Sequence, residues 1–255
     1  MIPRIGAGTG VVFSDVHIPD HDRKAVTKMC RLISDLKPDW LVADGDIVDC
    51  AEFSAHEIGS VKHFEGRRWS SSLAVAADVF DEIDDAAGRR CKRKVFIGGN
   101  HEDRIRRWVA RGDNAVFADD QELSIPHRLD FYKRGWEWDL DYPDAHVMAG
   151  KLLITHGQYA GKNAAKKHLD EYQCSILVGH THTDQTYHGS TFEDQRVAHC
   201  QGALGDFEAD AFRYKRRPRN WIKGFSVVTV RPNGNFFIQP VRFVAGEFAF
   251  GGKIY

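Results

Sequence analysis

Five short segments of this chain combine aspartate, histidine and asparagine, whose side chains bind metal ions. The segments are Asp15-Val16-His17, Gly45-Asp46-Ile47-Val48-Asp49, Gly99-Asn100-His101-Glu102, Thr155-His156-Gly157 and Gly179-His180-Thr181-His182. They offer carboxylate, imidazole and amide groups, the nitrogen and oxygen ligands that divalent transition metals accept. One such segment alone is weak evidence, because a lone histidine or aspartate is usually an ordinary polar residue. Five of them in one chain predict a centre for a pair of divalent metals.

Each of these segments follows a short apolar run that is typical of a buried strand. Ligands of open α/β sheets gather beyond the carboxyl ends of the strands, so we expect the five segments to converge on one edge. In Asp15-x-His17 and His180-x-His182, an extended backbone would place both side chains of a pair on the same face. Asp46 stands on a tight glycine turn and is the candidate for a carboxylate that bridges two metals.

The first half of the chain alternates strands with helices. Residues 10–13, 40–43 and 95–97 read as three strands. A helix capped by Asp22 separates the first two, and a helix that ends at Gly88 separates the second from the third. This order predicts right-handed βαβ units in a parallel sheet.

The second half reads as a second, more antiparallel sheet. Residues 145–148 and 151–155 form a predicted hairpin, and further strands are predicted at 175–178, 187–199, 224–230 and 236–241. Residues 111–140 fit neither half and are interpreted as an insertion over or beside the site. We therefore expect a single α/β domain over residues 1–255, with two sheets packed face to face and helices outside.

Composition narrows the class of protein. The chain has 255 residues, 42% of them apolar, and a formal net charge of -1, which excludes a strongly basic protein that coats nucleic acid. Its five cysteines are odd in number and form no CxxC pair, which favours a reducing compartment. We recognise no signal peptide and no membrane-spanning run, so we expect a cytoplasmic protein without a membrane partner.

The five motifs, in this order, resemble the calcineurin-like metallophosphoesterase family. The motifs run from residue 15 to residue 182, and the resemblance in strand order extends to near the C-terminus. It implies a four-layered αββα sandwich of two mixed β-sheets flanked by helices. It also implies a binuclear centre in which one metal is bound by Asp15, His17 and His182, Asp46 bridges both metals, and the other metal is bound by Asn100, His156 and His180.

The same resemblance assigns catalytic roles. His101 matches the family's catalytic histidine beside the metal-binding asparagine, and Asp49 matches the carboxylate that orients it. Two departures stand out: Cys50 occupies a position where arginine is frequent, so a phosphate-contacting arginine must come from elsewhere or be absent, and Glu102 occupies a position where aspartate is also frequent. We expect no large consequence from Glu102. By family resemblance the metal favoured in vitro is manganese, with iron, zinc, cobalt and nickel as alternatives.

The predicted activity is hydrolysis of a phosphate ester by metal-activated hydroxide. A phosphodiesterase acting on a nucleotide or nucleic acid is favoured because residues 212–221 interleave aromatic and basic side chains, and nuclease activity is a further possibility. The candidates for substrate binding are His21, Arg213, Lys215 and Arg216. A solvated loop would explain the basic residues of 212–221 equally well. The alternatives are a phosphomonoesterase, phosphoprotein phosphatases included, and a catalytically inactive metal-binding scaffold. The oligomeric state is left open.

Overall fold

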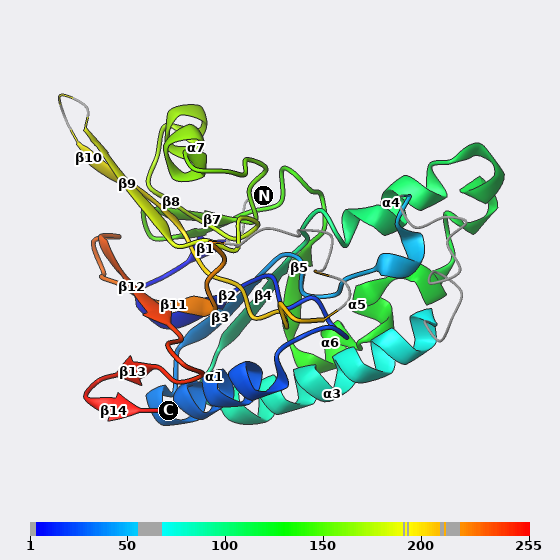
Figure 1. The fold of residues 1–255 in the computed structure, drawn as a ribbon, viewed down its shortest axis with the longest axis horizontal. Helices are drawn as coiled ribbons and strands as arrows, with labels where there is room; N and C mark the ends of the chain where they lie inside the picture. Colours follow the sequence, from blue (N-terminus) through cyan, green and yellow to red (C-terminus); the bar gives the residue numbers. More distant parts are fainter. Residues whose placement is uncertain (1–3, 56–67, 191, 193, 210–211, 213–219) are drawn as a thin grey trace.

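Two six-stranded β-sheets lie at the centre of the molecule (Figure 1). The structure is a computed structural model that describes residues 4–55, 68–190, 192, 194–209, 212 and 220–255. Both sheets contain parallel and antiparallel neighbours, and helices cover their outer faces. The predicted α/β sandwich of two mixed sheets is confirmed.

The first sheet has the strand order β12-β11-β2-β3-β4-β5. Strands β2 to β5 run parallel, whereas β11 pairs antiparallel with both β2 and β12. The bounds are β2 Gly8–Phe13, β3 Trp40–Asp44, β4 Arg93–Ile97, β5 Trp136–Asp139, β11 Gly224–Val230 and β12 Phe236–Arg242.

The second sheet has the strand order β1-β6-β7-β8-β10-β9. Strands β6 and β7 form the predicted hairpin, with Val147 opposite Ile154. The bounds are β1 Arg4–Ile5, β6 Val147–Ala149, β7 Leu152–Thr155, β8 Ile176–Val178, β9 Gln185–Ser190 and β10 Gln195–Cys200.

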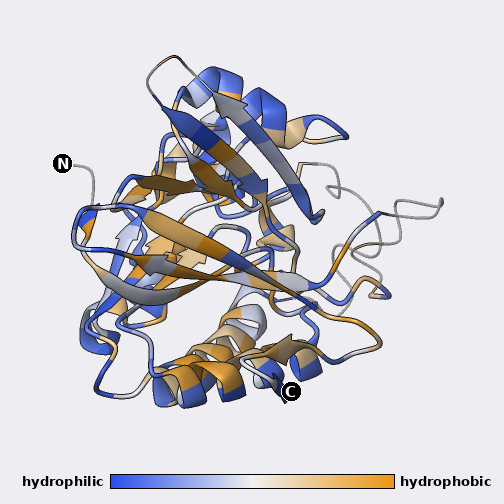
Figure 2. Cartoon of the chain, turned by 90° about the vertical axis from the view of Figure 1, so that its left-hand side faces the viewer, coloured by the Kyte–Doolittle hydropathy of each residue, from blue (hydrophilic) through white to orange (hydrophobic). Residues whose placement is uncertain are grey.

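Three apolar layers hold the sheets and helices together. Helices α1 (Arg23–Leu36) and α3 (Trp69–Ala87) bury their apolar faces on the outer side of the first sheet. Val12 and Val42 of that sheet meet Ile154 of the second sheet in the central layer. Helix α7 (Ala164–Tyr172) covers the other side of the second sheet. Figure 2 shows the same division, with apolar residues toward the interior and polar residues on the outward faces of the helices.

The helix caps follow the sequence closely. The Asp22 side chain accepts a hydrogen bond from the backbone N–H of Ala25, as its capping role predicts, and α1 ends where Lys37 turns left-handed. Helix α3 ends at Gly88. Asp22, Lys37 and Gly88 thus mark helix ends, and the position of each helix end determines where the following strand begins.

Short helices connect β4 to β5. They are α4 (Asp103–Val109), η2 (Gly112–Phe117), η3 (Gln121–Leu123), α5 (Ile125–Arg128) and α6 (Phe131–Arg134). The predicted insertion at 111–140 stays a prediction, but its last residues form β5, an edge strand of the first sheet. The remaining elements are η1 (Ala51–Phe53), β13 (Ala249–Phe250) and β14 (Lys253–Ile254). Among the described residues, no helix combines the length and the apolar composition needed to cross a membrane.

One part of the predicted topology is wrong. We expected residues 224–230 and 236–241 in the second sheet, but β11 and β12 extend the first sheet through β2. Strand β11 is buried on both faces except at Thr229, so it fits the interior of either sheet. Its apolar pattern identifies a strand but not the partner with which it pairs.

Candidate metal centre

The predicted ligands meet where strands of both sheets end. Asp15 and His17 follow β2, and Asp46 follows β3, both in the first sheet. His156 follows β7 and His180 follows β8, both in the second sheet. The site therefore lies across the two sheets, and its ligands come from segments far apart in sequence.

Most of these ligands have a left-handed backbone, which corrects the expectation that the pairs stay extended. Asp15 and His17 have φ of 53° and 55°, and His180 and His182 have φ of 63° and 56°. Such conformations cost a non-glycine residue about 1–3 kcal/mol and persist where the surroundings impose them. Here backbone hydrogen bonds help, because the N–H of Asp15 donates to Gly45 O at 3.0 Å and that of His17 to Asp46 O at 2.9 Å.

Glycines let the loops approach one another. A Cβ on Gly99 would lie 2.3 Å from Asp46 Oδ1 and 2.9 Å from His156 Cδ2. Gly45, with φ of +74°, lies against the same histidine, where a Cβ would fall 2.5 Å from its ring. The glycines of the motifs thus provide the space in which the ligands converge.

The first cluster contains Asp15, His17 and His182. His182 Nε2 lies 3.0 Å from Asp15 Oδ1 and 3.2 Å from His17 Nε2. Asp15 Oδ1 is buried, and among the described residues it faces the imidazole nitrogens of His182 and of His17, the latter at 4.0 Å. Ligand atoms about 2.1 Å from one metal ion lie roughly 3.0–4.2 Å from each other as the angle between them widens from 90° to 180°, so these three atoms fit around a divalent cation.

The second cluster contains Asp46, His156 and His180. His156 Nε2 lies 3.2 Å from Asp46 Oδ2 and 3.3 Å from Asn100 Oδ1. His156 Nδ1 lies 2.8 Å from the carbonyl oxygen of Asp44, which leaves Nε2 as the nitrogen available to a metal. The donor set of each cluster, nitrogen and oxygen without thiolate, suits a divalent transition metal.

Burial and neighbouring charge set the protonation states of these ligands. Burial raises the pKa of Asp15, but His182 and His156 outweigh it and lower the pKa to about 2. Asp46 likewise has its pKa held well below the usual range by His101 and His156, against the effect of burial. Burial and the charge of His156 lower the pKa of His180 to about 4. Ionised carboxylates and a neutral imidazole are the forms that bind metal, whereas Asp46 and Asp15 raise the pKa of His156 well above its usual value against the effect of burial, so a metal must displace a proton from that residue.

His101 and Asp49 form a pair beside both clusters. His101 Nδ1 lies 2.8 Å from Asp49 Oδ1, and the same oxygen lies 3.1 Å from His17 Nδ1. Burial lowers the pKa of His101, but Asp46 and Asp49 more than compensate, so the pKa is raised above its ordinary value. The side chain of His101 is 17% exposed, and its other nitrogen, Nε2, lies 3.1 Å from Arg104 Nη2.

Glu102 has a structural role that the motif alone did not reveal. Its carboxylate accepts the backbone N–H groups of Asp46, Ile47, Val48 and Gly99 at 2.8–2.9 Å. Burial and the charge of Asp46 raise its pKa. Glu102 therefore joins the loop after β3 to the loop after β4 and holds Asp46 in place.

Sequence reasoning also missed Arg104 and His168. Arg104 Nη1 donates to the carbonyl oxygen of Asp49 at 2.7 Å, and Nη2 lies 3.1 Å from His101 Nε2. A guanidinium group thus stands beside the His101–Asp49 pair, whereas Cys50 is buried in the position where arginine is frequent. His168 is buried, and its Nε2 accepts the N–H groups of Gln158 and Tyr159 in the loop after His156.

Aromatic side chains from the predicted basic-aromatic stretch lie against the first cluster. The ring of Phe212 is 5.0 Å from that of His17, and the ring of Trp221 is 4.7 Å from that of His182. The three predicted substrate-binding residues between them, Arg213, Lys215 and Arg216, lie outside the described residues. His21 is partly buried with its Nδ1 3.2 Å from Pro19 O, and its role in substrate binding stays a prediction.

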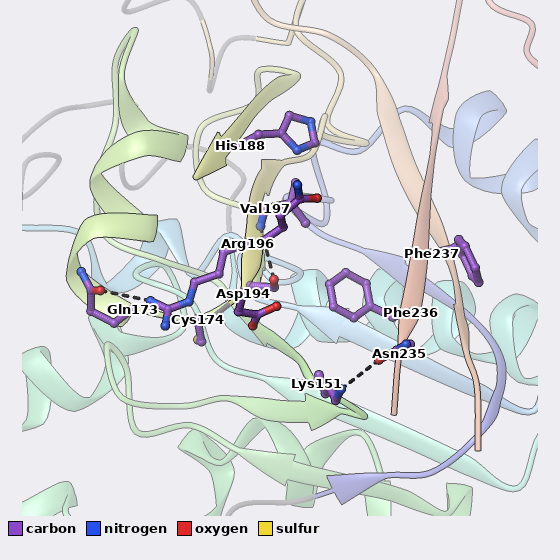
Figure 3. A pocket seen from close by; sticks show the side chains of 12 residues that line it. Lys151, Gln173, Cys174, His188, Asp194, Arg196, Val197, Asn235, Phe236 and Phe237 are labelled. Carbon is purple, nitrogen blue, oxygen red and sulfur yellow. Dashed lines mark hydrogen bonds between the residues drawn. The ribbon is translucent and has the colours of Figure 1, made fainter. Parts of the chain in front are cut away.

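A separate groove of about 600 Å³ lies away from the metal centre (Figure 3). Its lining includes Asp194, Arg196 and Phe236, and none of the predicted ligands borders it. Arg196 bonds to Gln173 at 3.1 Å and Lys151 to Asn235 at 2.9 Å, so its polar groups pair with one another.

Two mixed β-sheets flanked by helices, with clustered Asp, His and Asn side chains across their strand ends, define a class of α/β proteins with a candidate binuclear metal centre. The chain belongs to the calcineurin-like phosphoesterase family, whose model matches residues 10–213. The resemblance inferred from the motifs is thereby confirmed.

Two relatives that match nearly the whole chain are phage proteins. The chain is 25% identical over 263 residues to the Gene 54 protein of Mycobacterium phage D29 and 25% identical over 267 residues to that of Mycobacterium phage L5; each match covers 96% of this chain and 97% of the relative. Among solved structures, Vps29 of Entamoeba histolytica in complex with Zn²⁺ is similar, with a TM-score of 0.45, 10% identity and coverage of 97% of each chain. Vps29 of Cryptosporidium parvum is also similar, with a TM-score of 0.42 and 13% identity, and the match covers 98% of this chain and 95% of that one.

Proposed function

We propose that this protein is a binuclear metal-dependent phosphodiesterase that acts on a nucleotide or nucleic acid. The observation that carries the proposal is the convergence of seven predicted ligands, from both sheets, beside the His101–Asp49 pair. The ligands are Asp15, His17, Asp46, Asn100, His156, His180 and His182. With Asp46 as the bridge, two divalent metals bound there would activate water and offset the charge of a phosphate group.

The residues of the chain supply the other parts of the reaction. Asp49 holds His101 Nδ1, so Nε2 is directed to the leaving oxygen, to which a protonated His101 donates a proton. Arg104 lies 3.1 Å from the same nitrogen, so an anionic oxygen that approaches His101 also meets a guanidinium group. Asn100 adds an amide group at the edge of the second cluster. The intact pair of His101 and Asp49 favours an enzyme over an inactive scaffold.

The preference for a nucleotide or nucleic acid rests on the surroundings of the site. Phe212 and Trp221 lie against ligands of the first cluster, and the residues between them in sequence include five basic side chains. Aromatic and basic groups together bind the bases and the backbone of single-stranded nucleic acid.

The test is hydrolysis of bis(4-nitrophenyl) phosphate and of 4-nitrophenyl phosphate by metal-stripped protein, before and after addition of Mn²⁺. We expect metal-dependent activity that is higher on the diester and is lost in Asp46→Asn. Higher activity on the monoester would support a phosphomonoesterase instead. Absence of activity on both, in folded and metal-loaded protein, would refute the proposal and favour a metal-binding scaffold.

A further inference from the structure

A small pocket beside the metal centre is lined by three arginines. It has a volume of about 160 Å³, and its walls include Phe53, Ser54, Asn100, Arg104, Arg107 and Arg111. One water molecule needs about 10–15 Å³ of such space, so the pocket admits a group much larger than water. Arg104 and Arg107 stand three residues apart on α4, and Arg111 follows the helix in extended backbone and lines the same pocket.

The pocket adjoins the catalytic pair. Arg104 lies 3.1 Å from His101 Nε2, and Arg107 donates to the backbone oxygen of Asn100 at 2.7 Å. Asn100 Oδ1 is in turn 3.3 Å from His156 Nε2 in the second cluster. Asn100 is therefore a wall shared by the metal centre and the pocket, so a ligand can occupy both at once.

The positive charge of the pocket is only partly offset. Arg107 pairs with Asp103 at 2.8 Å, and Arg104 lies 3.7 Å from Asp49 Oδ2. Arg111 has no carboxylate partner in the described part of the chain. Three guanidinium groups with one left free are suited to a phosphate group, which they can bind through paired N–H donors.

We propose that this pocket binds a second phosphate of the substrate, next to the phosphate at which cleavage occurs. The inference rests on the proposed function for the position of the scissile phosphate, while the anion site itself follows from the arginines. Two substrates carry such a group: a nucleic-acid strand, whose neighbouring internucleotide phosphate would occupy the pocket, and a small nucleotide with two separate phosphates.

The test measures binding without turnover. Fluorescence anisotropy of labelled octathymidylate is followed with the full-length protein in chelator, with Arg111→Gln as the variant. Hydrogen bonds to a charged group correspond to about a tenfold or larger change in affinity, so we expect Arg111→Gln to weaken binding at least tenfold. Losing one phosphate contact should also make the slope of log K against log salt shallower by about 0.7.

Arg106→Gln is the matched control. Arg106 is on the same helix with a side chain 64% exposed, pairs with Asp103 and does not line the pocket. If both variants weaken the binding of octathymidylate equally, the effect is one of general charge and the proposal is overturned. The proposal is also overturned if Arg111→Gln changes the affinity for none of the ligands tested. If octathymidylate does not bind but thymidine 3′,5′-bisphosphate binds in a manner that depends on Arg111, the small nucleotide is the source of the second phosphate.

Kinetics separate this inference from the proposed function. We expect 5′-phosphorylated dithymidylate to have a higher kcat/KM than dithymidylate without that phosphate, and Arg111→Gln to reduce this ratio. Binding that depends on Arg111 without any metal-dependent hydrolysis would uphold the pocket and refute the diesterase. The opposite result is metal-dependent hydrolysis in which Arg111→Gln changes neither the ratio of the two kcat/KM values nor the binding of octathymidylate. That result would uphold the diesterase and refute the pocket.

Discussion

Asp49 connects two histidines with different tasks. One oxygen of its carboxylate lies 2.8 Å from Nδ1 of His101 and 3.1 Å from Nδ1 of His17, a predicted metal ligand. The two histidines lower the pKa of Asp49 well below its ordinary range against the effect of burial, so the carboxylate is ionised. The single negative charge of Asp49 thus orients both His101, the predicted acid, and His17, a predicted metal ligand. A substitution of Asp49 should therefore disturb both histidines.

His101→Asn tests the role of His101 as the acid. The loss of kcat should be about 10²- to 10⁴-fold for dithymidylate, whose alkoxide leaving group needs a proton, and smaller for bis(4-nitrophenyl) phosphate. Steady-state kinetics on both substrates provide the measurement. In the Asp49→Asn background the same substitution should cost less, because the two residues act as a unit. Equal losses for both leaving groups would contradict the assignment.

Residue types in the motifs were enough to predict which side chains cluster, because few other arrangements explain five such segments at strand ends. Glu102 and Arg104 could not be assigned in this way. Their partners are backbone groups and a histidine in loops that only the fold brings together, at sequence separations of up to 56 residues. A motif shows which hydrogen-bonding groups a side chain carries, but not which distant backbone groups it will bind.

At the scale of elements, the loops after β3 and β4 depend on each other. Glu102→Gln keeps the size of the side chain but replaces one accepting oxygen with a donor amide, which faces backbone N–H groups. Leaving buried donors unsatisfied costs about 1–3 kcal/mol each, so we expect the free energy of unfolding to fall by about 2 kcal/mol or more. Urea unfolding of the metal-free protein measures this change separately from metal binding. The exposed Glu247→Gln is the control, and an equally small effect of both would argue against the bridging role.

Gly99→Ala probes the contact between the same loops. The added methyl group would overlap Asp46 and His156, and both belong to the second cluster. Displacing groups that support a metal site typically costs 10- to 100-fold in metal affinity, which we expect here for Mn²⁺ measured by calorimetry. Gly112→Ala is the control, because nothing lies within 4 Å of its added Cβ. Similar affinities for the two variants would show that the loops tolerate the methyl group.

Element positions followed from the sequence, whereas strand partners did not. The cap at Asp22, the stop at Gly88 and the hairpin of β6 and β7 are local features, and the structure confirms each of them. The pairing of β11 with β2 joins residues more than 200 positions apart, and apolar periodicity carries no information about such a partner. The left-handed turns at the ligands were missed for a related reason, since surrounding loops impose them.

At the scale of the whole molecule, the site joins the two sheets. The first sheet delivers Asp15, His17, Asp46 and Asn100, and the second delivers His156, His180 and His182. Several of these ligands are held in left-handed conformations, and a buried oxygen of Asp15, from the first sheet, lies 3.0 Å from His182 Nε2, from the second. An ion that binds both sets should therefore favour the docked arrangement of the sheets over the unfolded chain.

Metal binding should for this reason raise Tm. A ligand present at about 100 times its Kd stabilises the folded state by about 2.7 kcal/mol. For a chain of this size that corresponds to an increase in Tm of about 5–10 °C, measured by calorimetry with and without Mn²⁺. Asp46→Asn should remove most of the increase, because the predicted bridging carboxylate is lost, whereas Arg106→Gln, outside both clusters, should retain it. An increase that is the same in Asp46→Asn would mean that the metal stabilises the protein from another site, and the assignment of the two clusters would then be wrong.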